Sequence, residues 1–392
     1  MASKCSLFCV TALLASSLGL SAVDLSSELA SGSIWRKDRQ NVCSTDFVGL
    51  RYMPIDDYTI RLCPRLTVAE ADNNAQKKKA SLKAKSDLTI GKLEFGETIV
   101  RWNRDSNDTM NMLGLVYNRG DDGEITKAEF AKLIKKSIKE LDAMTSKVGY
   151  VRESKGKGDE DHVGLPGLRH WYWEWADGVL LLEASATEME NGEIRPEFIR
   201  LKMGPTPEAI ATGGADNFSS GKWMQQNVKK EGGKVYIAGI PMVDQGQKGY
   251  CAVATVARVF AYYGADAVDQ HALAQLCDTL TEGGTYVHLI EKALNDMGKQ
   301  FHFLPQILCY SYNCKGGIPS NQLKDFVESY VNNGAPVIWT IDGHMRMIIG
   351  YNKSTNEIYY SDSWGQGHEM KPMSLNKAAK MTICLHVIVP TR

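Results

Sequence analysis

Stretches that alternate between apolar and polar residues, or that run apolar, characterise the first half of the chain. Three stretches show this pattern, at residues 169–175, 179–188 and 194–203, and turn sequences at 176–178 and 190–192 separate them. Because successive side chains of a strand point to opposite faces of a sheet, the pattern predicts three neighbouring antiparallel strands. Two earlier stretches are also strand-like, residues 89–102, with a turn at Phe95-Gly96-Glu97, and residues 112–118.

One stretch of the first half has helical spacing instead. Thr126 and Glu129 form a capping-box sequence. Apolar residues then recur at three- and four-residue intervals, at Phe130, Leu133, Ile134, Ile138 and Leu141. This spacing predicts an amphipathic helix. We expect the aromatic residues of 170–175 to pack against it.

The sequence Asn118–Glu129 also resembles part of a calcium-binding EF-hand loop. Asp122 and Glu129 stand at matching positions, but Gly120 occupies a slot that needs an oxygen ligand. No helix-like sequence precedes the stretch. We therefore favour a turn followed by a capped helix, with a calcium site as the alternative.

Helix-like patterns come first in the second half of the chain, and strand-like patterns follow. Apolar residues at helical spacing after Cys251, namely Val253, Val256, Val259 and Phe260, predict a helix that Gly264 would end. Further helices are expected at 269–277, 286–297 and 321–332, and strands at 235–237, 337–341, 344–351 and 358–362. Both halves are thus expected to be α+β.

Between the two halves the composition changes. Pro205, Pro207, Gly213-Gly214 and the sequence Ser219-Ser220-Gly221 predict a linker. We therefore expect a signal peptide at 1–22, an N-terminal α+β domain of unknown role at 23–203, a linker at 204–233 and a second domain at 234–392.

The N-terminus has the features of a secretory signal. Lys4 precedes an apolar run from Leu7 to Leu20, and small residues near Ala22 offer a cleavage site. A membrane anchor is the alternative, but the run is short and contains serine and glycine. We expect a secreted or periplasmic protein, with no stable membrane insertion after signal cleavage.

The net charge and the number of cysteines limit the classes of binding partner and the cellular compartment that we expect for this protein. The formal net charge is −1 over 392 residues, without a basic patch interleaved with aromatic residues, so nucleic acid is not expected as a partner. Seven of the nine cysteines follow the predicted signal peptide. Without Cys251 they are six, an even number that fits an exported protein. Cys43 with Cys63 and Cys309 with Cys314 are the nearest pairs, which leaves Cys277 and Cys384; free thiols are the alternative.

The candidate nucleophile is Cys251, at the beginning of an apolar helix. Unpaired N–H groups and the positive end of the helix dipole favour a thiolate at this position. Gln245 precedes it by six residues, and its amide could donate to a developing oxyanion if Gly246 and Gly249 let the loop fold back. A buried structural cysteine is the alternative.

The candidate base is His344, which opens a strongly β-type run. If residues 344–351 and 358–362 form a hairpin about the turn at 353–356, Asp362 comes within a few residues of opposite His344. Cross-strand neighbours lie about 5 Å apart, near enough for a carboxylate to hold the imidazole. His368 is the rival base, but it lies in a glycine-rich loop with no strand to position it.

These motifs together resemble papain-like cysteine peptidases over residues 235–392. Gln245 to Cys251 is similar to the nucleophile loop of that family, Gly343-His344 to its histidine strand, and Asp362-Ser363-Trp364-Gly365 to its Asn-Ser-Trp-Gly motif. Aspartate in place of asparagine resembles the bacterial branch of double-glycine leader peptidases. The resemblance implies a helical part plus an antiparallel sheet, a peptide or protein substrate, and catalysis by Cys251, His344, Asp362 and Gln245 without a metal or cofactor.

Two other functions stay open from the sequence. The same residues could perform acyl transfer or amide hydrolysis on a non-protein substrate. Alternatively, the chain could be a non-catalytic binding protein that uses its N-terminal sheet. The N-terminal domain itself could be a binding module or an intramolecular pro-segment that is removed by cleavage in the linker.

Overall fold

The computed structural model describes most of the chain between residues 23 and 391. The described residues are 23–38, 42, 51–63, 88–102, 110–147, 149–152, 165, 167–210, 221–246, 249–265, 268–279, 284–301, 303–309 and 317–391. The predicted signal peptide at 1–22 lies outside them, as do Cys43, Cys314 and the middle of the predicted linker. No helix among the described residues has the length and apolar character needed to cross a membrane.

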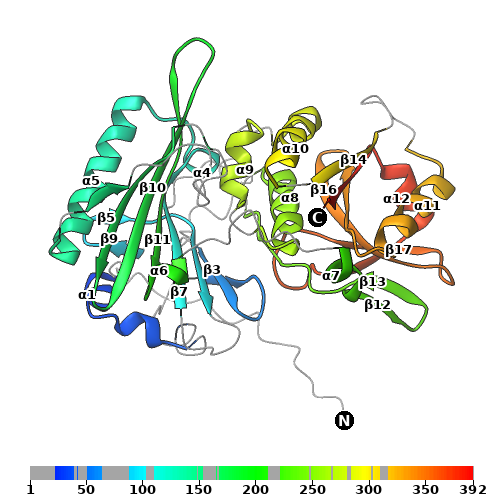
Figure 1. The fold of residues 1–392 in the computed structure, drawn as a ribbon, viewed down its shortest axis with the longest axis horizontal. Coiled ribbons are helices and arrows are strands. Elements are labelled where there is room, and N and C mark those ends of the chain that lie inside the picture. The colour runs from blue at the N-terminus through cyan, green and yellow to red at the C-terminus, as the bar shows by residue number, and fades with distance from the viewer. Residues whose placement is uncertain are drawn as a thin grey trace, which may run out of the picture.

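A large antiparallel sheet forms the N-terminal part of the molecule (Figure 1). Its strand order is β2 (Arg51–Pro54), β3 (Thr59–Cys63), β6 (Thr98–Trp102), β7 (Met110–Asn118), β11 (Ile194–Gly204), β10 (Gly178–Glu188), β9 (Arg169–Trp175) and β8 (Tyr150–Arg152). A small sheet of β1 (Val23–Asp24), β4 (Leu88–Ile90) and β5 (Leu93–Glu94) accompanies it, together with α1 (Ser26–Ala30) and a 3-10 turn at Ser33–Arg36. The strands predicted at 112–118, 169–175, 179–188 and 194–203 are confirmed.

The helix α5 (Lys127–Thr145) covers one face of this sheet. Both hydrogen bonds of the capping box between Thr126 and Glu129 are formed, as predicted. Phe130 and Leu141 share a core with alternate strand residues such as Leu180 and Leu182. The expected aromatic contact is also present, because Trp173 lies in this core and its indole N–H donates to Asp142 Oδ1 at 2.8 Å. Strand alternation therefore gives the sheet one face for the helix.

The segment that resembles an EF-hand forms a helical turn. Residues Arg119–Asp122 are α4, and a strand precedes them. The Asp122 carboxylate accepts a hydrogen bond from the Asn118 backbone N–H at 2.9 Å, and the Glu129 carboxylate accepts from the Thr126 backbone N–H at 2.8 Å. These carboxylates cap backbone groups, which agrees with the favoured turn and capped helix.

Two expectations about the strands and the linker differ from the structure. Residues 95–97 do not close a hairpin, because β5 pairs with β4 whereas β6 pairs with β3 and β7. Part of the stretch expected as a linker is helix and strand, with α6 (Pro207–Ile210), α7 (Gly221–Gln226) and β12 (Val228–Glu231). Strand β12 pairs with β13 (Lys234–Ile237), so the C-terminal sheet begins earlier than expected.

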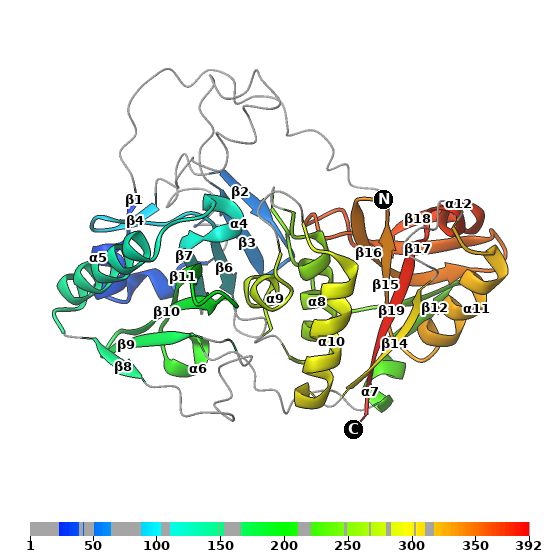
Figure 2. The ribbon, with the colours of Figure 1, turned by 90° about the horizontal axis from the view of Figure 1, so that it is seen from above.

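The C-terminal part combines helices with an antiparallel sheet, as predicted (Figure 2), and two of its strands, β12 and β13, precede the helices. Its helices are α8 (Cys251–Tyr262), α9 (Gln270–Leu276), α10 (Val287–Phe301), α11 (Ser320–Val331) and α12 (Leu375–Met381). Its remaining strands are β14 (Phe303–Cys309), β15 (Val337–Ile341), β16 (His344–Asn352), β17 (Glu357–Ser361), β18 (Lys371–Ser374) and β19 (Cys384–Pro390). Helix α8 is almost entirely buried in the core of this part.

Helices α8, α9 and α10 lie between the two large sheets in both ribbon views. Helix α9 and the residues that flank it contact the N-terminal part of the chain through buried polar groups. Arg119 donates to the Thr279 carbonyl at 2.8 Å, and Ser185 donates to Gln275 Oε1 at 2.7 Å. Arg200 on β11 also forms an ion pair with Asp269, the N-cap of α9. The two parts of the chain are therefore joined by specific contacts.

The structure does not agree with the expected pairing of Cys277 with Cys384. Cys277 is a buried free thiol whose pKa is raised to about 12 by burial, whereas Cys384 is disulfide-bonded. A bond between these two is therefore wrong. The sheet register offers a reason, because Cys384 on β19 lies opposite Cys309 on β14, while Cys277 ends the helix α9. Cys251 is free.

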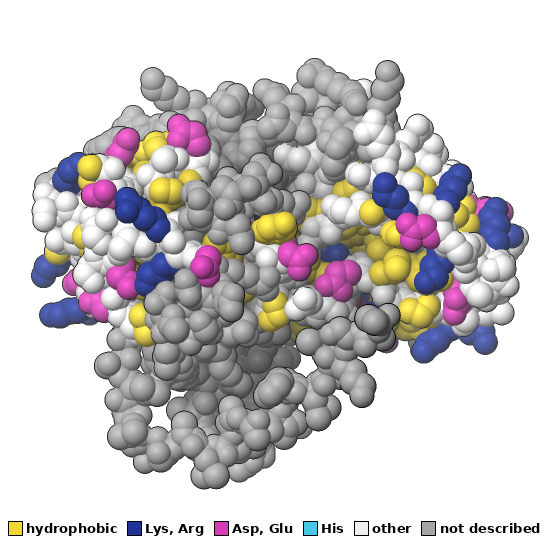
Figure 3. Space-filling view, turned by 90° about the horizontal axis from the view of Figure 1, so that it is seen from below, with side chains coloured by type: hydrophobic (Ala, Val, Ile, Leu, Met, Phe, Trp, Pro, Cys, Tyr) yellow, Lys and Arg dark blue, Asp and Glu magenta, His cyan; other side chains and the backbone are white. Residues whose placement is uncertain are grey.

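Charges of both signs are interspersed on the face shown in Figure 3. Among the described side chains there, the basic and acidic residues do not separate into large patches of one sign. This distribution accords with a net charge near zero.

Candidate active site

Cys251 is the first residue of α8, and the local sequence explains its position. The apolar run after it buries the helix, and Tyr250 precedes it as an N-cap without a capping side-chain bond. The first-turn N–H groups are therefore not satisfied by the side chain that most helices place there. Cys251 is half-buried, with its thiol unbonded to another sulfur.

His344 begins β16 and lies directly after a two-residue turn. Asp342-Gly343 connects β15 to β16, and Gly343 has a φ of 68°, which glycine adopts without strain. Strand β17 then returns beside β16, with Met347 opposite Ser361, and Asp362 follows at its end. This hairpin places His344 Nε2 at 2.6 Å from Asp362 Oδ1.

The three groups form one hydrogen-bonded chain. Burial lowers the pKa of His344, but side-chain hydrogen bonds to Asp362 and Cys251, together with the charges of both, outweigh it and raise the pKa to about 9. Because Nε2 faces Asp362, Nδ1 is the ring nitrogen left for the thiol. Burial raises the pKa of Asp362, yet His344 and the nearby Arg346 hold it below its usual value. The structure thus brings Cys251, His344 and Asp362 together.

Asp362 has further partners that fix its position. Arg346 Nε lies 3.3 Å from its Oδ2, and the Ser363 N–H donates to its Oδ1 at 3.2 Å. Its backbone N–H donates to the His368 carbonyl at 3.0 Å. The His368 ring instead has Lys371 Nζ at 3.0 Å from its Nδ1. His368, the alternative candidate base, therefore supports Asp362 through its backbone carbonyl.

Arg258 is a residue of the site that the sequence reading missed. It lies on α8, seven residues after Cys251, and its side chain is fully buried. Its guanidinium donates to the Pro241 carbonyl at 2.8 Å, the Asp362 carbonyl at 3.0 Å and Ser361 Oγ at 2.6 Å. Burial lowers its pKa to about 10. A single arginine in an otherwise apolar helix is the feature of the sequence that could have indicated this residue.

Gln245 lies in the segment that leads to Cys251 and is buried. Its backbone N–H donates to the Ser363 carbonyl at 2.9 Å, so the loop that carries Gln245 is tied to the segment that carries Asp362. Within the described part of the chain, its side-chain Oε1 has no hydrogen-bond partner. The backbone contact, and not the side-chain oxygen, therefore ties Gln245 to the segment of Asp362.

Trp364 covers one side of the His344 ring, the candidate base. Its ring stacks on that of His344, with centroids 6.3 Å apart and an interplanar angle of 27°. The side chain is 40% exposed. The indole therefore shields the imidazole while its outer face stays in contact with solvent.

One group of potential metal ligands lies elsewhere among the described residues. Ligand atoms of Glu291, Cys384 and His386 lie within 4.8 Å of one another. Because Cys384 is disulfide-bonded, it cannot act as a thiolate ligand. These residues do not fit a metal centre.

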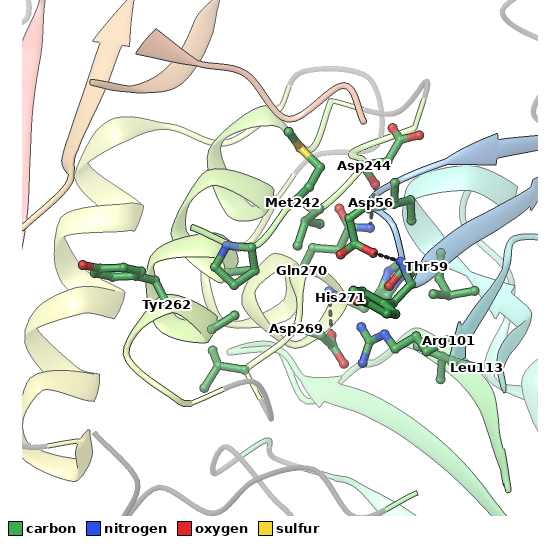
Figure 4. Close-up of a pocket in the computed structure, with 18 of the residues that line it drawn as sticks. Asp56, Thr59, Arg101, Leu113, Met242, Asp244, Tyr262, Asp269, Gln270 and His271 are labelled. Carbon is green, nitrogen blue, oxygen red and sulfur yellow. Dashed lines mark hydrogen bonds between the residues drawn. The ribbon is translucent and has the colours of Figure 1, made fainter. Parts of the chain in front are cut away.

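A cavity of about 440 Å³ lies between the N-terminal sheet and helices α8 and α9 (Figure 4). Asp56, Thr59 and Arg101 contribute to it from the N-terminal part, whereas Asp244 and Gln270 contribute from the C-terminal part. Cys251, His344 and Asp362 do not line it. The cavity instead borders the loop that leads to Gln245.

Comparison with known proteins finds one family that is similar to the second part of the chain. Residues 237–382 match the Peptidase_C39 like family. The peptidase domain of Streptococcus ComA, described as a bi-functional ABC transporter involved in a quorum-sensing pathway, matches with 18% identity and a TM-score of 0.30. That match covers 39% of this chain and all of the ComA chain. No curated protein matches significantly. Over residues 237–382 the chain is accordingly similar to the Peptidase_C39 like family, and this similarity supports a cysteine-type peptidase.

Proposed function

We propose that this protein is an exported peptidase that hydrolyses peptide bonds with Cys251 as nucleophile, His344 as acid and base, and Asp362 as the group that orients His344. One observation carries this proposal: Asp362 holds His344 at 2.6 Å, and His344 is in turn hydrogen-bonded to Cys251. A nucleophile, a base and a third group that orients the base are the parts that covalent acyl transfer needs.

The charge state of His344 supports this assignment. With a pKa of about 9, the imidazole is protonated at neutral pH. The imidazolium beside the sulfur and the N-terminus of α8 both favour the thiolate, which is the reactive form of cysteine. The site can therefore hold a thiolate and an imidazolium as an ion pair before substrate binds.

The reaction follows from this pair. The Cys251 thiolate attacks the peptide carbonyl carbon, and its electron pair moves onto the carbonyl oxygen. The Cys251 backbone N–H and the Gln245 side-chain amide donate to that oxyanion. His344 protonates the leaving amine as the C–N bond breaks and a thioester forms. Neutral His344 then takes a proton from water, which attacks the thioester and releases the acid and the thiolate.

Export is the second part of the proposal. The sequence of residues 1–22 has the charge, apolar run and small residues of a signal peptide. The disulfide at Cys384 supports an oxidising compartment, because such bonds are rare in cytosolic proteins. Secretion or the periplasm fits both features.

The test compares Cys251 with Cys277, the two cysteines that are free among the described residues. Iodoacetamide should label Cys251 and leave the buried Cys277 unmodified at neutral pH. C251A should abolish hydrolysis of fluorescein-labelled casein and of a general peptide library, whereas C277S should retain it. Turnover that survives in C251A, or labelling that is unaffected by H344A, would remove Cys251 from the proposed role.

The library experiment also separates hydrolysis from acyl transfer. Products cleaved at a peptide bond, with a free carboxylate on the new C-terminus, support the proposal. Products in which an added amine replaces that carboxylate identify a transferase with the same triad. Binding of peptides with no C251A-sensitive product would instead indicate a non-catalytic binding protein.

A further inference from the structure

We infer that the N-terminal part of the chain supplies a positioning residue to the peptidase site: Arg61 holds the loop that carries the oxyanion donor Gln245. This inference rests on the proposed function, because it assigns Gln245 that role. It also changes the role of the N-terminal domain, from a removable inhibitor to a part of the working enzyme.

The first contact is a buried ion pair between the two parts of the chain. Arg61 on β3 reaches Asp244, the residue directly before Gln245, with Nε at 3.0 Å and Nη2 at 2.9 Å from Asp244 Oδ2. The side chains are 10% and 1% exposed. Arg61 also has Glu97 at 4.0 Å. A buried carboxylate needs such a partner, since an unpaired charge there is strongly unfavourable.

The second oxygen of Asp244 shapes the backbone around Gln245. Asp244 Oδ1 accepts the Gly246 N–H at 2.8 Å, and Gly246 has a φ of 69°, which favours glycine. The two neighbours of Gln245 are therefore linked through one carboxylate, and Arg61 anchors that carboxylate. Movement of Asp244 would move both sides of Gln245.

A backbone contact extends the same support to the other loop of the site. The Pro54 carbonyl on β2 accepts the Gln366 N–H at 3.2 Å. Gly365, with a φ of 79°, lies so close that an added Cβ would be 3.1 Å from the Pro54 oxygen. The strands β2 and β3 pair with each other. This one hairpin thus contacts the segment before Gln245 and the segment after Trp364.

The cavity explains why the loop depends on polar anchors. Pro241, Met242, Val243 and Asp244 line it, so one side of this segment faces about 440 Å³ of space. Figure 4 shows Asp244 at the edge of the cavity, with Gln270 also lining it. A segment without close packing on one side gains little from dispersion contacts there. Arg61, together with Gln270 Nε2 at 3.3 Å from the Asp244 carbonyl, holds it in place.

Loss of Arg61 should slow acylation and leave the thiolate intact. Removal of an oxyanion donor typically costs about 100- to 1000-fold in rate. Displacement of the donor should cost less, so we expect acylation in R61M to slow by about 10- to 100-fold. Alkylation by iodoacetamide needs a thiolate but no oxyanion donor, and should change less than about threefold.

The experiment measures both reactions in the full chain. Acylation is followed as the burst of p-nitrophenol from p-nitrophenyl acetate, and alkylation with iodoacetamide. The matched control is R119M, which removes a buried arginine that also bridges the two parts, through a hydrogen bond to the Thr279 carbonyl. Acylation slowed in R61M and unchanged in R119M supports the inference. Equal effects of the two variants on acylation would overturn it.

A double-mutant cycle separates positioning from general destabilisation. Q245A should slow acylation by about 100- to 1000-fold, and R61M should add nothing to Q245A, because both act through the same donor. A slowing by R61M that multiplies that of Q245A would refute the assignment. If R61M does not fold, R61K keeps the charge without the forked contact and should slow acylation with the same dependence on Gln245. A wild-type chain without a Cys251-dependent burst would instead refute the proposed function.

Discussion

Replacement of Asp362 by asparagine should change the pH at which the site loses activity. His344 has a pKa of about 9 because hydrogen bonds to Asp362 and Cys251 and their charges outweigh burial, which lowers it. Asparagine retains an oxygen for the bond that now spans 2.6 Å but carries no charge. A nearby opposite charge typically raises a pKa by about 1 to 3, so we expect the pKa of His344 in D362N to be roughly 7.

The direction of the pH shift follows from the protonation state of His344 that hydrolysis requires. Hydrolysis needs an imidazolium to protonate the leaving amine, so activity falls as pH rises through the pKa of His344. The wild-type rate of peptide hydrolysis should therefore fall above about pH 9. The rate in D362N should fall above roughly pH 7.

The assay is the pH dependence of kcat/KM for peptide hydrolysis, with iodoacetamide alkylation of Cys251 as a second measurement. D342N is the matched control, because Asp342 is exposed in the turn two residues before His344 and loses the same charge. A basic limb that stays in place in D362N, or that moves equally in D342N, would refute the argument that Asp362 sets the pKa of His344.

Three further predictions concern the support of the site. R258M leaves the Pro241 and Asp362 carbonyls and Ser361 Oγ without their donor, so it should lower the free energy of unfolding by about 3 kcal/mol or more in a denaturant titration. G365A should slow peptide hydrolysis and lower the melting temperature, because alanine at a φ of 79° is strained and its Cβ approaches the Pro54 carbonyl. The control position is the exposed Gly367, where an added Cβ meets nothing within 4 Å. T126A should lower the melting temperature through loss of the α5 cap without changing kcat, and a changed kcat would show that α5 influences the peptidase site.

The sequence predicted the parts of the fold and site whose determinants are local. Cys251 lies at the beginning of a helix whose apolar spacing is plain, and the burial of α8 agrees with it. His344 and Asp362 are 18 residues apart and share one hairpin, so a turn and two strands suffice to bring them together. The Thr126 cap of α5 is local for the same reason.

Features that depend on distant partners could not be predicted in this way. Phe95-Gly96-Glu97 looks like a hairpin turn, but the Gly96 N–H donates to the Leu115 carbonyl on another strand. Gly114 leaves the space that the Phe95 ring occupies. Arg61 and Asp244 are 183 residues apart, and neither has a sequence pattern that points to the other. Tertiary contacts of this kind decide which strands and side chains pair where the local sequence leaves the choice open.

Helix α8 shows how the local and distant contacts combine in the site. Cys251 and Arg258 are seven residues apart, or about 10 Å along a helix, so one rigid element carries the proposed nucleophile at its end and a buried cation two turns later. The cation has carbonyl and hydroxyl partners in the segment of Ser361 and Asp362. Because Asp362 in turn orients His344, a shift of α8 moves the thiol and the support of the base together. The separation of sulfur and imidazole is therefore fixed through the helix as well as through the hydrogen bond between them, which gives the buried charge of Arg258 a role in an otherwise apolar helix.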